Sequence, residues 1–150
     1  GRYNEAVEQC RRTIEMDPNF AVAHWHLGLA YEQTGTFDEA IAEFQRAITL
    51  SGGSPLLKAS LGHAYAKANR KAEATKILGE LNELSKQRYV SSYEKAAITL
   101  ALGDERQTFE WLEKAYEEHS FHMVYLKVWP QFSAIRRDPR FQQLVQRLGL

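Results

Sequence analysis

Apolar residues recur along this chain at the spacing of an α-helix, in pairs of helical stretches separated by short turns. Residues 21–54 hold the clearest pair, whose two stretches meet at Gly35. Within the pair, small residues such as Gly28 alternate with large ones such as Leu27 and Phe44. Small residues let two helices approach closely, and large residues fill the space that remains. The pattern therefore predicts two antiparallel helices that pack against each other.

The same pattern returns with a period of 34 residues. It aligns two sets of positions, which are Gly1, Gly35, Asn69 and Gly103 at the turn and Ala6, Ala40, Ala74 and Thr108 in the helix that follows. A fixed period of this size is typical of stacked helical repeats, because no single repeat can bury its apolar face alone. The expected divisions are the second half of a truncated repeat at 1–20, repeats at 21–54 and 55–88, a degenerate repeat at 89–120, and capping helices at 121–150.

These residues resemble the tetratricopeptide repeat, whose signature is Trp-x-x-Leu-Gly-x-x-Tyr, then Ala-x-x-x-Phe, then Pro over 34 residues. The chain matches it at Leu27, Gly28, Tyr31, Ala40 and Phe44. His24 stands at the tryptophan position with Trp25 one residue later, and Gly52 replaces the closing proline. The resemblance implies an all-α fold, an α-solenoid of antiparallel helix-turn-helix repeats that forms a right-handed superhelix with C-terminal capping helices.

Turn and cap residues predict where the helices begin and end. Gly35 and Asn69 suit the left-handed conformation that a tight turn between helices requires. Asn19, Ser54 and Asp138 are expected to cap the helices that follow them. The expected helices cover 3–16, 20–33, 38–50, a stretch from 55, a stretch from 71, 105–118, a short stretch within 123–128 ended by Pro130, and a stretch from 139.

The N-terminal end indicates that the chain is a piece of a longer protein, whereas Gly149-Leu150 resembles a chain end. Gly1 already lies at the turn position of a repeat, so the first helix of that repeat is missing. The C-terminal part, with segments 111–116, 125–128, 137–141 and 147–150, resembles certain bacterial signalling proteins. In those proteins a repeat region of this kind follows an effector such as a winged-helix DNA-binding domain, a nucleotide cyclase or a protein kinase. The resemblance implies a C-terminal sensing or docking module.

The net charge of the chain does not indicate a particular class of partner. Lys and Arg together number 19, as do Asp and Glu, so the formal net charge is zero. The last 30 residues carry a local net of +4, from Lys127, Arg136, Arg137, Arg140 and Arg147 against Asp138. This patch lacks the strongly basic stripe that nucleic-acid binding normally requires, so we do not expect a nucleic-acid partner. No apolar run is long enough for a membrane helix, and no membrane contact is expected.

The sequence offers no arrangement of residues that predicts catalysis, a metal or a cofactor. Cys10 is the only cysteine, and because it aligns with Phe44 in the repeat it is expected to be a buried packing residue. A single cysteine forms no internal disulfide and leaves the cellular compartment open. His24 and His26 diverge by roughly 200° on a helix, so they cannot share a metal. We therefore expect a non-catalytic module.

A concave surface is the expected functional feature. In tetratricopeptide arrays the first helix of each repeat lines the concave face, and the matching positions here form a candidate partner-binding groove. Its members are Val22, Trp25, Leu29, Glu32, Gln33, Leu56, Ala59, His63, Lys67, Tyr93 and Ala97. Aromatic residues in such a groove are common anchors for a protein or peptide ligand. The one-residue shift that puts Trp25 in the groove gives that residue a candidate role.

Two functions remain open at this stage. In the first, the chain binds a peptide or protein segment in the apolar groove. In the second, copies of the chain associate through the groove or through the truncated N-terminal face and so control an attached effector domain. A preceding repeat or another copy could also cover Trp25 and leave no free groove. Repeat arrays of one fold bind unrelated partners, so the fold does not choose between these functions.

Overall fold

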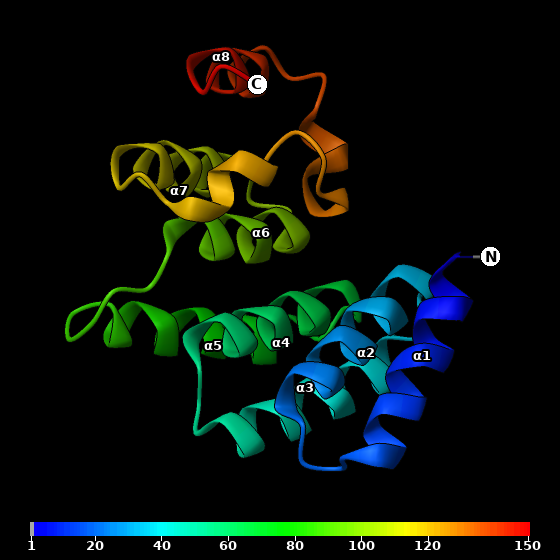
Figure 1. Cartoon of the computed structure of the whole chain (residues 1–150). Coiled ribbons are helices and arrows are strands. Elements are labelled where there is room, and N and C mark those ends of the chain that lie inside the picture. Colours follow the sequence, from blue (N-terminus) through cyan, green and yellow to red (C-terminus); the bar gives the residue numbers. More distant parts are fainter. Residues whose placement is uncertain (1) are drawn as a thin grey trace.

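The chain is an all-helical solenoid that ends in a compact C-terminal cap (Figure 1). The structure is a computed structural model that describes residues 2–150. Its α-helices are α1 (Arg2–Met16), α2 (Ala21–Thr34), α3 (Phe37–Ser51), α4 (Pro55–Lys67), α5 (Lys71–Leu84), α6 (Ser92–Leu102), α7 (Glu105–Glu117) and α8 (Pro139–Arg147). Two 3₁₀ helices, η1 (Phe121–Tyr125) and η2 (Pro130–Ile135), connect α7 to α8. The predicted α-solenoid is confirmed.

The same turn closes α2, α4 and α6. Gly35 has φ 80° and Asn69 has φ 59°, so both adopt the predicted left-handed conformation. The residue after each of them donates its N–H to a carbonyl near the end of the helix, Tyr31 after α2 and Tyr65 after α4. This hydrogen bond satisfies a carbonyl that has no partner within the helix. The predicted aligned turns are therefore one local structure, and Gly1 lies outside the described residues.

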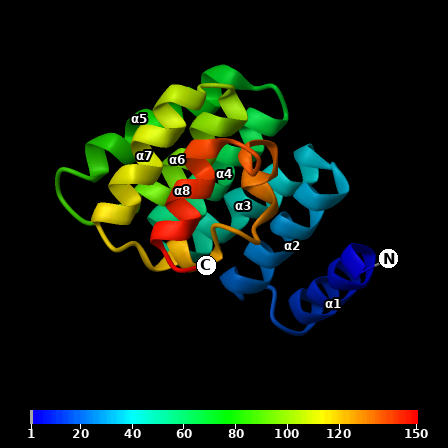
Figure 2. The same ribbon diagram turned by 90° about the horizontal axis from the view of Figure 1, so that it is seen from above.

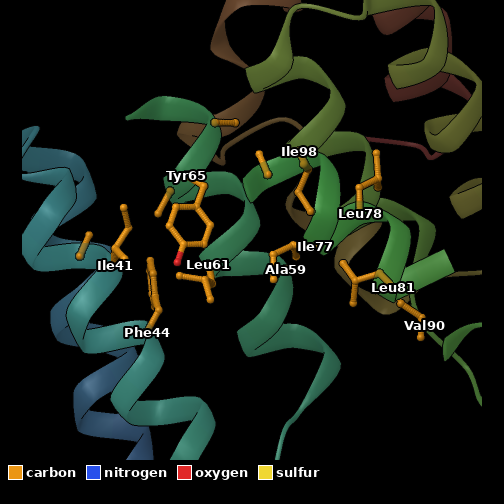
Figure 3. Packing of buried hydrophobic residues seen from close by; sticks show 14 residues of the cluster. Ile41, Phe44, Ala59, Leu61, Tyr65, Ile77, Leu78, Leu81, Val90 and Ile98 are labelled. Carbon is orange, nitrogen blue, oxygen red and sulfur yellow. The ribbon is translucent and has the colours of Figure 1, made fainter. Parts of the chain in front are cut away.

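Buried hydrophobic side chains fill the core around α3, α4 and α5 (Figure 3), and glycines on neighbouring helices make room for two of them. Phe44 is fully buried on α3, with its ring against Gly28 on α2. A β-carbon placed on Gly28 would lie 2.6 Å from Cε1 of Phe44. Gly62 on α4 meets Ile77 of α5 in the same way, at 2.8 Å. The repeat therefore uses glycine where the side chain of the next helix needs the space.

Two local expectations about the N-terminal half are wrong. Phe20 is the N-cap residue of α2, and Asn19 instead donates its N–H to Asp17 Oδ1 at 3.1 Å. Cys10 is only half-buried, because α1 packs on α2 alone and has no fully buried residue. Burial nevertheless raises the pKa of the Cys10 thiol, so the reactive thiolate is disfavoured.

The C-terminal cap contains one helix more than the sequence predicted. Pro130 was expected to end a short helix, and it does follow η1, but it also begins η2 as its first residue. Proline suits the first position of a helix because its missing N–H has no helical partner there in any case. The buried side chains of this segment, Met123, Leu126, Phe132 and Ile135, join a second core with α6, α7 and α8.

Helix α8 packs its buried apolar face into the second core, and two arginines add contacts to α7. Asp138 caps α8 as predicted, its side chain accepting from the N–H of Arg140. The guanidinium of Arg140 lies 3.9 Å from the ring centre of Phe109, and that of Arg147 lies 2.8 Å from the carboxylate of Glu113. These contacts therefore engage two of the five basic residues of the C-terminal segment, Arg140 and Arg147, with α7. Within residues 2–150, none of the helices is long and apolar enough to cross a bilayer.

Candidate interaction groove

Three adjoining hollows form a groove between the first helices of the repeats and the 3₁₀ segment of the cap. The large hollow has a volume of about 370 Å³, the middle hollow about 20 Å³ and the outer hollow about 210 Å³. The large and middle hollows share His63 and Gln131, and the middle and outer hollows share Leu56 and Glu94. Figures 1 and 2 show the segment 121–135, in gold to orange, beside α6. We call the three hollows together the concave groove.

Most of the residues predicted for the groove do line it. The middle hollow contains six of them, Trp25, Leu29, Leu56, Ala59, His63 and Ala97. The large hollow contains Glu32, Gln33, His63 and Lys67. Val22 is exposed but lines none of the three hollows. Tyr93, the remaining predicted residue, lines none of the three hollows either.

Tyr93 is fully buried beneath the cap and does not reach the groove surface. Its ring meets Phe132 edge-on with 5.1 Å between ring centres, and Trp129 with 6.0 Å. The hydroxyl is buried without a hydrogen-bond partner among the described residues, and burial raises the Tyr93 pKa. The repeat position of Tyr93 was read correctly, but a segment outside the repeats covers it. Tyr93 therefore supports the groove from below instead of offering a surface to a partner.

Trp25 is held in place at the middle hollow. Its indole Nε1–H donates to Oγ of Ser60 at 3.0 Å, and that hydroxyl donates to the carbonyl of Leu56 at 3.2 Å. Both partners belong to α4, so the bond ties the first helices of two successive repeats together. The ring is only partly buried, and one part of it remains available to a ligand. A half-buried, immobilised tryptophan is a typical binding anchor.

Buried histidine–carboxylate pairs occupy the inter-helix contacts around the groove. Nδ1 of His63 lies 2.8 Å from Oε1 of Glu32, and both side chains are almost fully buried. His24, which replaces the tryptophan of the repeat signature, pairs with Glu43 at 2.6 Å and with the carbonyl of Pro18 at 3.0 Å. His24 therefore fills a structural position between α2 and α3, and this leaves Trp25 for the groove.

A third pair connects the cap to α6. Nδ1 of His122 lies 2.5 Å from Oε1 of Glu94, which lines both the middle and the outer hollow. The close contact with the Glu94 carboxylate raises the pKa of His122, and burial opposes this increase only in part. Within residues 2–150, no three His, Cys, Asp or Glu side chains are placed to hold a metal ion together. The chemistry of the groove is therefore hydrogen bonding, aromatic contact and charge.

The far wall of the groove could not be located from the repeat pattern. Trp129 lines the middle hollow, Gln131 lines the middle and large hollows, and Pro130, Ser133 and Ala134 line the large one. All of them come from the non-periodic segment, which carries no aligned positions. A tryptophan next to a proline after the last repeat is the one feature that could have drawn attention to this wall.

Comparison with known proteins agrees with this architecture. The tetratricopeptide-repeat family matches residues 1–55 and again residues 33–96. Anaphase-promoting complex subunit 3 from Schizosaccharomyces pombe is 23% identical over 133 residues. That match covers 86% of this chain, which spans only 20% of the length of the relative. Residues 1–96 of this chain are therefore tetratricopeptide repeats.

Proposed function

We propose that this chain is a non-catalytic interaction module that binds a segment of a partner protein in the concave groove. Tetratricopeptide repeats generally mediate contacts between proteins. The observation that carries the proposal is Trp25, which is partly exposed at the centre of the groove and fixed there by Ser60. The large hollow beside it has room for side chains of a partner and is lined by polar groups, among them Gln33 and Lys67.

The finer setting of this module is also a proposal. The C-terminal resemblance supports a place in a bacterial signalling or regulatory protein, with the repeats attached to an effector domain. The S. pombe relative is named as a subunit of a complex and is much longer than this chain. Both findings favour a module that connects a larger protein to its partner.

Replacing Trp25 with alanine is expected to abolish capture of the partner from a lysate of the source cell. The loss of an aromatic anchor at an interface typically costs more than 2 kcal/mol, roughly a thirtyfold loss of affinity. Trp111→Ala is a matched control, because Trp111 is also partly buried but lines none of the three hollows. The helicity and the mass in solution of both variants are checked before capture.

A photo-crosslinking residue at Gln33 then locates the contact. Gln33 is exposed and lines the large hollow, whereas Lys76 is exposed on α5 and lines none of the three hollows. A partner that crosslinks from position 33 and not from position 76 lies in the groove. Equal capture by Trp25→Ala and the parent, with crosslinks only from position 76, would contradict the proposal.

A second candidate function is self-association. The outer side of the cap exposes a row of apolar side chains, with Phe121 71% and Val128 65% exposed and Val124 and Tyr125 between them. Exposed apolar patches of this kind often mark contacts between proteins. Analytical ultracentrifugation distinguishes the candidates, because self-association predicts a mass that rises with concentration and falls after Phe121→Ser. A constant monomer mass leaves only the groove.

A further inference from the structure

We propose that the contact between His122 and Glu94 is a pH-sensitive latch that holds the cap segment 121–129 against α6 and sets the width of the concave groove at its middle hollow. The inference rests on the proposed function only for its effect on partner binding. The latch itself follows from the structure of the cap, and it can be tested without a partner.

The Glu94 carboxylate depends on His122. Both oxygens of the Glu94 carboxylate are buried without a hydrogen-bond partner among the described residues, and the charged group in contact with it is the His122 imidazole, whose Nδ1 lies 2.5 Å from Oε1. Only 11% of the Glu94 side chain is exposed. A buried carboxylate whose charge is not balanced is costly, and a protonated imidazole provides the balancing charge. A neutral imidazole can still donate through Nδ1, but it leaves the negative charge uncompensated.

Among the described residues, the outer hollow that His122 lines contains no charged group besides Glu94 and His122. Of the groups around the imidazole, Tyr93 belongs to α6 and has a buried, unpaired hydroxyl. Tyr89 lines the outer hollow together with His122, and the residues of α4 in that hollow are Pro55 and Leu56, which do not titrate. Beside this hollow, Arg88 donates to the carbonyl of Gly53. Glu118 accepts hydrogen bonds from Ser92.

His122 contacts the wall of the groove through the ring of Trp129. The two rings stack with 6.2 Å between their centres and 29° between their planes. Trp129 lines the middle hollow, as Trp25 does from the repeat side. The middle hollow is narrow, and the large and outer hollows lie on either side of it. A small displacement of the His122 and Trp129 side chains would widen this narrow point, while the buried side chains of Met123, Leu126, Phe132 and Ile135 keep the cap in the core.

The direction of the pH dependence follows from the raised pKa of His122. A histidine that binds its proton more tightly in the closed state stabilises that state fully below its free pKa of about 6.5. The stabilisation is lost as the pH rises through the higher value of the closed state. The latch is therefore closed below about pH 6.5 and loosens as the pH rises through the closed-state pKa of His122.

Hydrogen exchange between about pH 6 and about pH 8 tests the latch directly. The reporters are the amides of Leu126 and Trp129, which donate to the carbonyls of Met123 and Tyr125. After correction for the intrinsic exchange rate, their protection should fall as the pH rises. Protection should fall by at most roughly tenfold for each unit by which the His122 pKa in the closed state exceeds about 6.5. An NMR titration of the His122 ring measures that pKa independently.

Glu94→Gln should remove the pH dependence and return the His122 pKa to about 6.5 or below. Glu43→Gln is the matched control, because it removes the carboxylate of the His24 pair on α3, away from the three hollows. It should leave the pH dependence of Leu126 and Trp129 unchanged. Protection that stays constant with pH in the parent, or that still falls in Glu94→Gln, would overturn the latch.

The effect of the latch on the width of the groove is measured separately, by NMR of Trp25. The indole N–H resonance of Trp25 should shift with the same pH midpoint as the ring of His122 in the parent, and should not do so in Glu94→Gln. A latch seen by exchange without this shift would overturn the control of groove width. Failure of partner capture at both pH values, with the latch intact, would count against the proposed function alone.

Discussion

Tyr93→Ala is expected to lower the free energy of unfolding by about 3–5 kcal/mol, whereas Tyr93→Phe is expected to raise it by about 1 kcal/mol. Tyr93 is fully buried, and its ring packs against Trp129 and Phe132 of the cap. Truncation to alanine therefore leaves a cavity between α6 and the cap. Phenylalanine keeps the ring and removes only a hydroxyl that is buried without a partner.

Urea unfolding followed by helical circular dichroism measures both changes. The two substitutions differ by the aromatic ring alone, so opposite signs separate packing from hydrogen bonding. A loss of stability in Tyr93→Phe would show that the hydroxyl has a partner, for example a bound water. The large cost expected for Tyr93→Ala also explains why Trp25, and not Tyr93, is the suitable residue for testing partner binding.

The repeat pattern predicted the solenoid because each of its positions has a local physical role. Gly35 and Asn69 were assigned to turns from their backbone preferences, and both have positive φ. The alternation of Gly28 with large residues indicated a close approach of helices, and Phe44 lies there. Such features depend on neighbours within one period, so they can be read without knowing the rest of the fold.

The cap could not be placed in this way. Residues 121–135 have no counterpart in the repeats, and their apolar side chains contact residues of α6 far away in the sequence. The pattern therefore gave the position of Tyr93 on its helix, but not the side chains that cover it. The same limit applies to the contact between Glu94 and His122, because His122 belongs to a segment without a counterpart in the repeats.

The cap of α2 shows a different limit of prediction from sequence. Asn19 is a favourable capping residue, and only one position separates it from the observed cap at Phe20. Its N–H is instead used in a turn that follows Asp17, whose Oδ1 accepts at 3.1 Å. Two short polar residues next to a proline compete for the same backbone groups, and sequence preference alone does not decide between them.

Gly28→Ala is expected to lower the free energy of unfolding by about 1–3 kcal/mol, although alanine is the better helix former by about 1 kcal/mol. The new β-carbon would lie 2.6 Å and 2.7 Å from two ring atoms of Phe44. Phe44 is fully buried and cannot turn away without disturbing the contact between α2 and α3. Overpacking should therefore exceed the gain in helix propensity.

Gly79→Ala is the matched control and should raise the free energy of unfolding by about 0.5–1 kcal/mol. Gly79 lies inside α5, and no atom lies within 4 Å of the position of its missing β-carbon. The same change from glycine to alanine is thus made inside two helices. At Gly28 the new β-carbon meets the Phe44 ring, and at Gly79 it meets no side chain. Urea unfolding of the two variants and the parent gives both values.

A double-mutant cycle then identifies the cause of the loss. In a Phe44→Leu background the two ring atoms are absent, so Gly28→Ala should cost less than in the parent by about 0.5–3 kcal/mol. An unchanged cost would mean that the backbone of α2, and not the ring of Phe44, requires glycine. Gly28 has no positive φ, which already argues against a backbone requirement. The glycine of the repeat signature is therefore explained by the aromatic side chain on the neighbouring helix, and the pair should tolerate change only when both members change together.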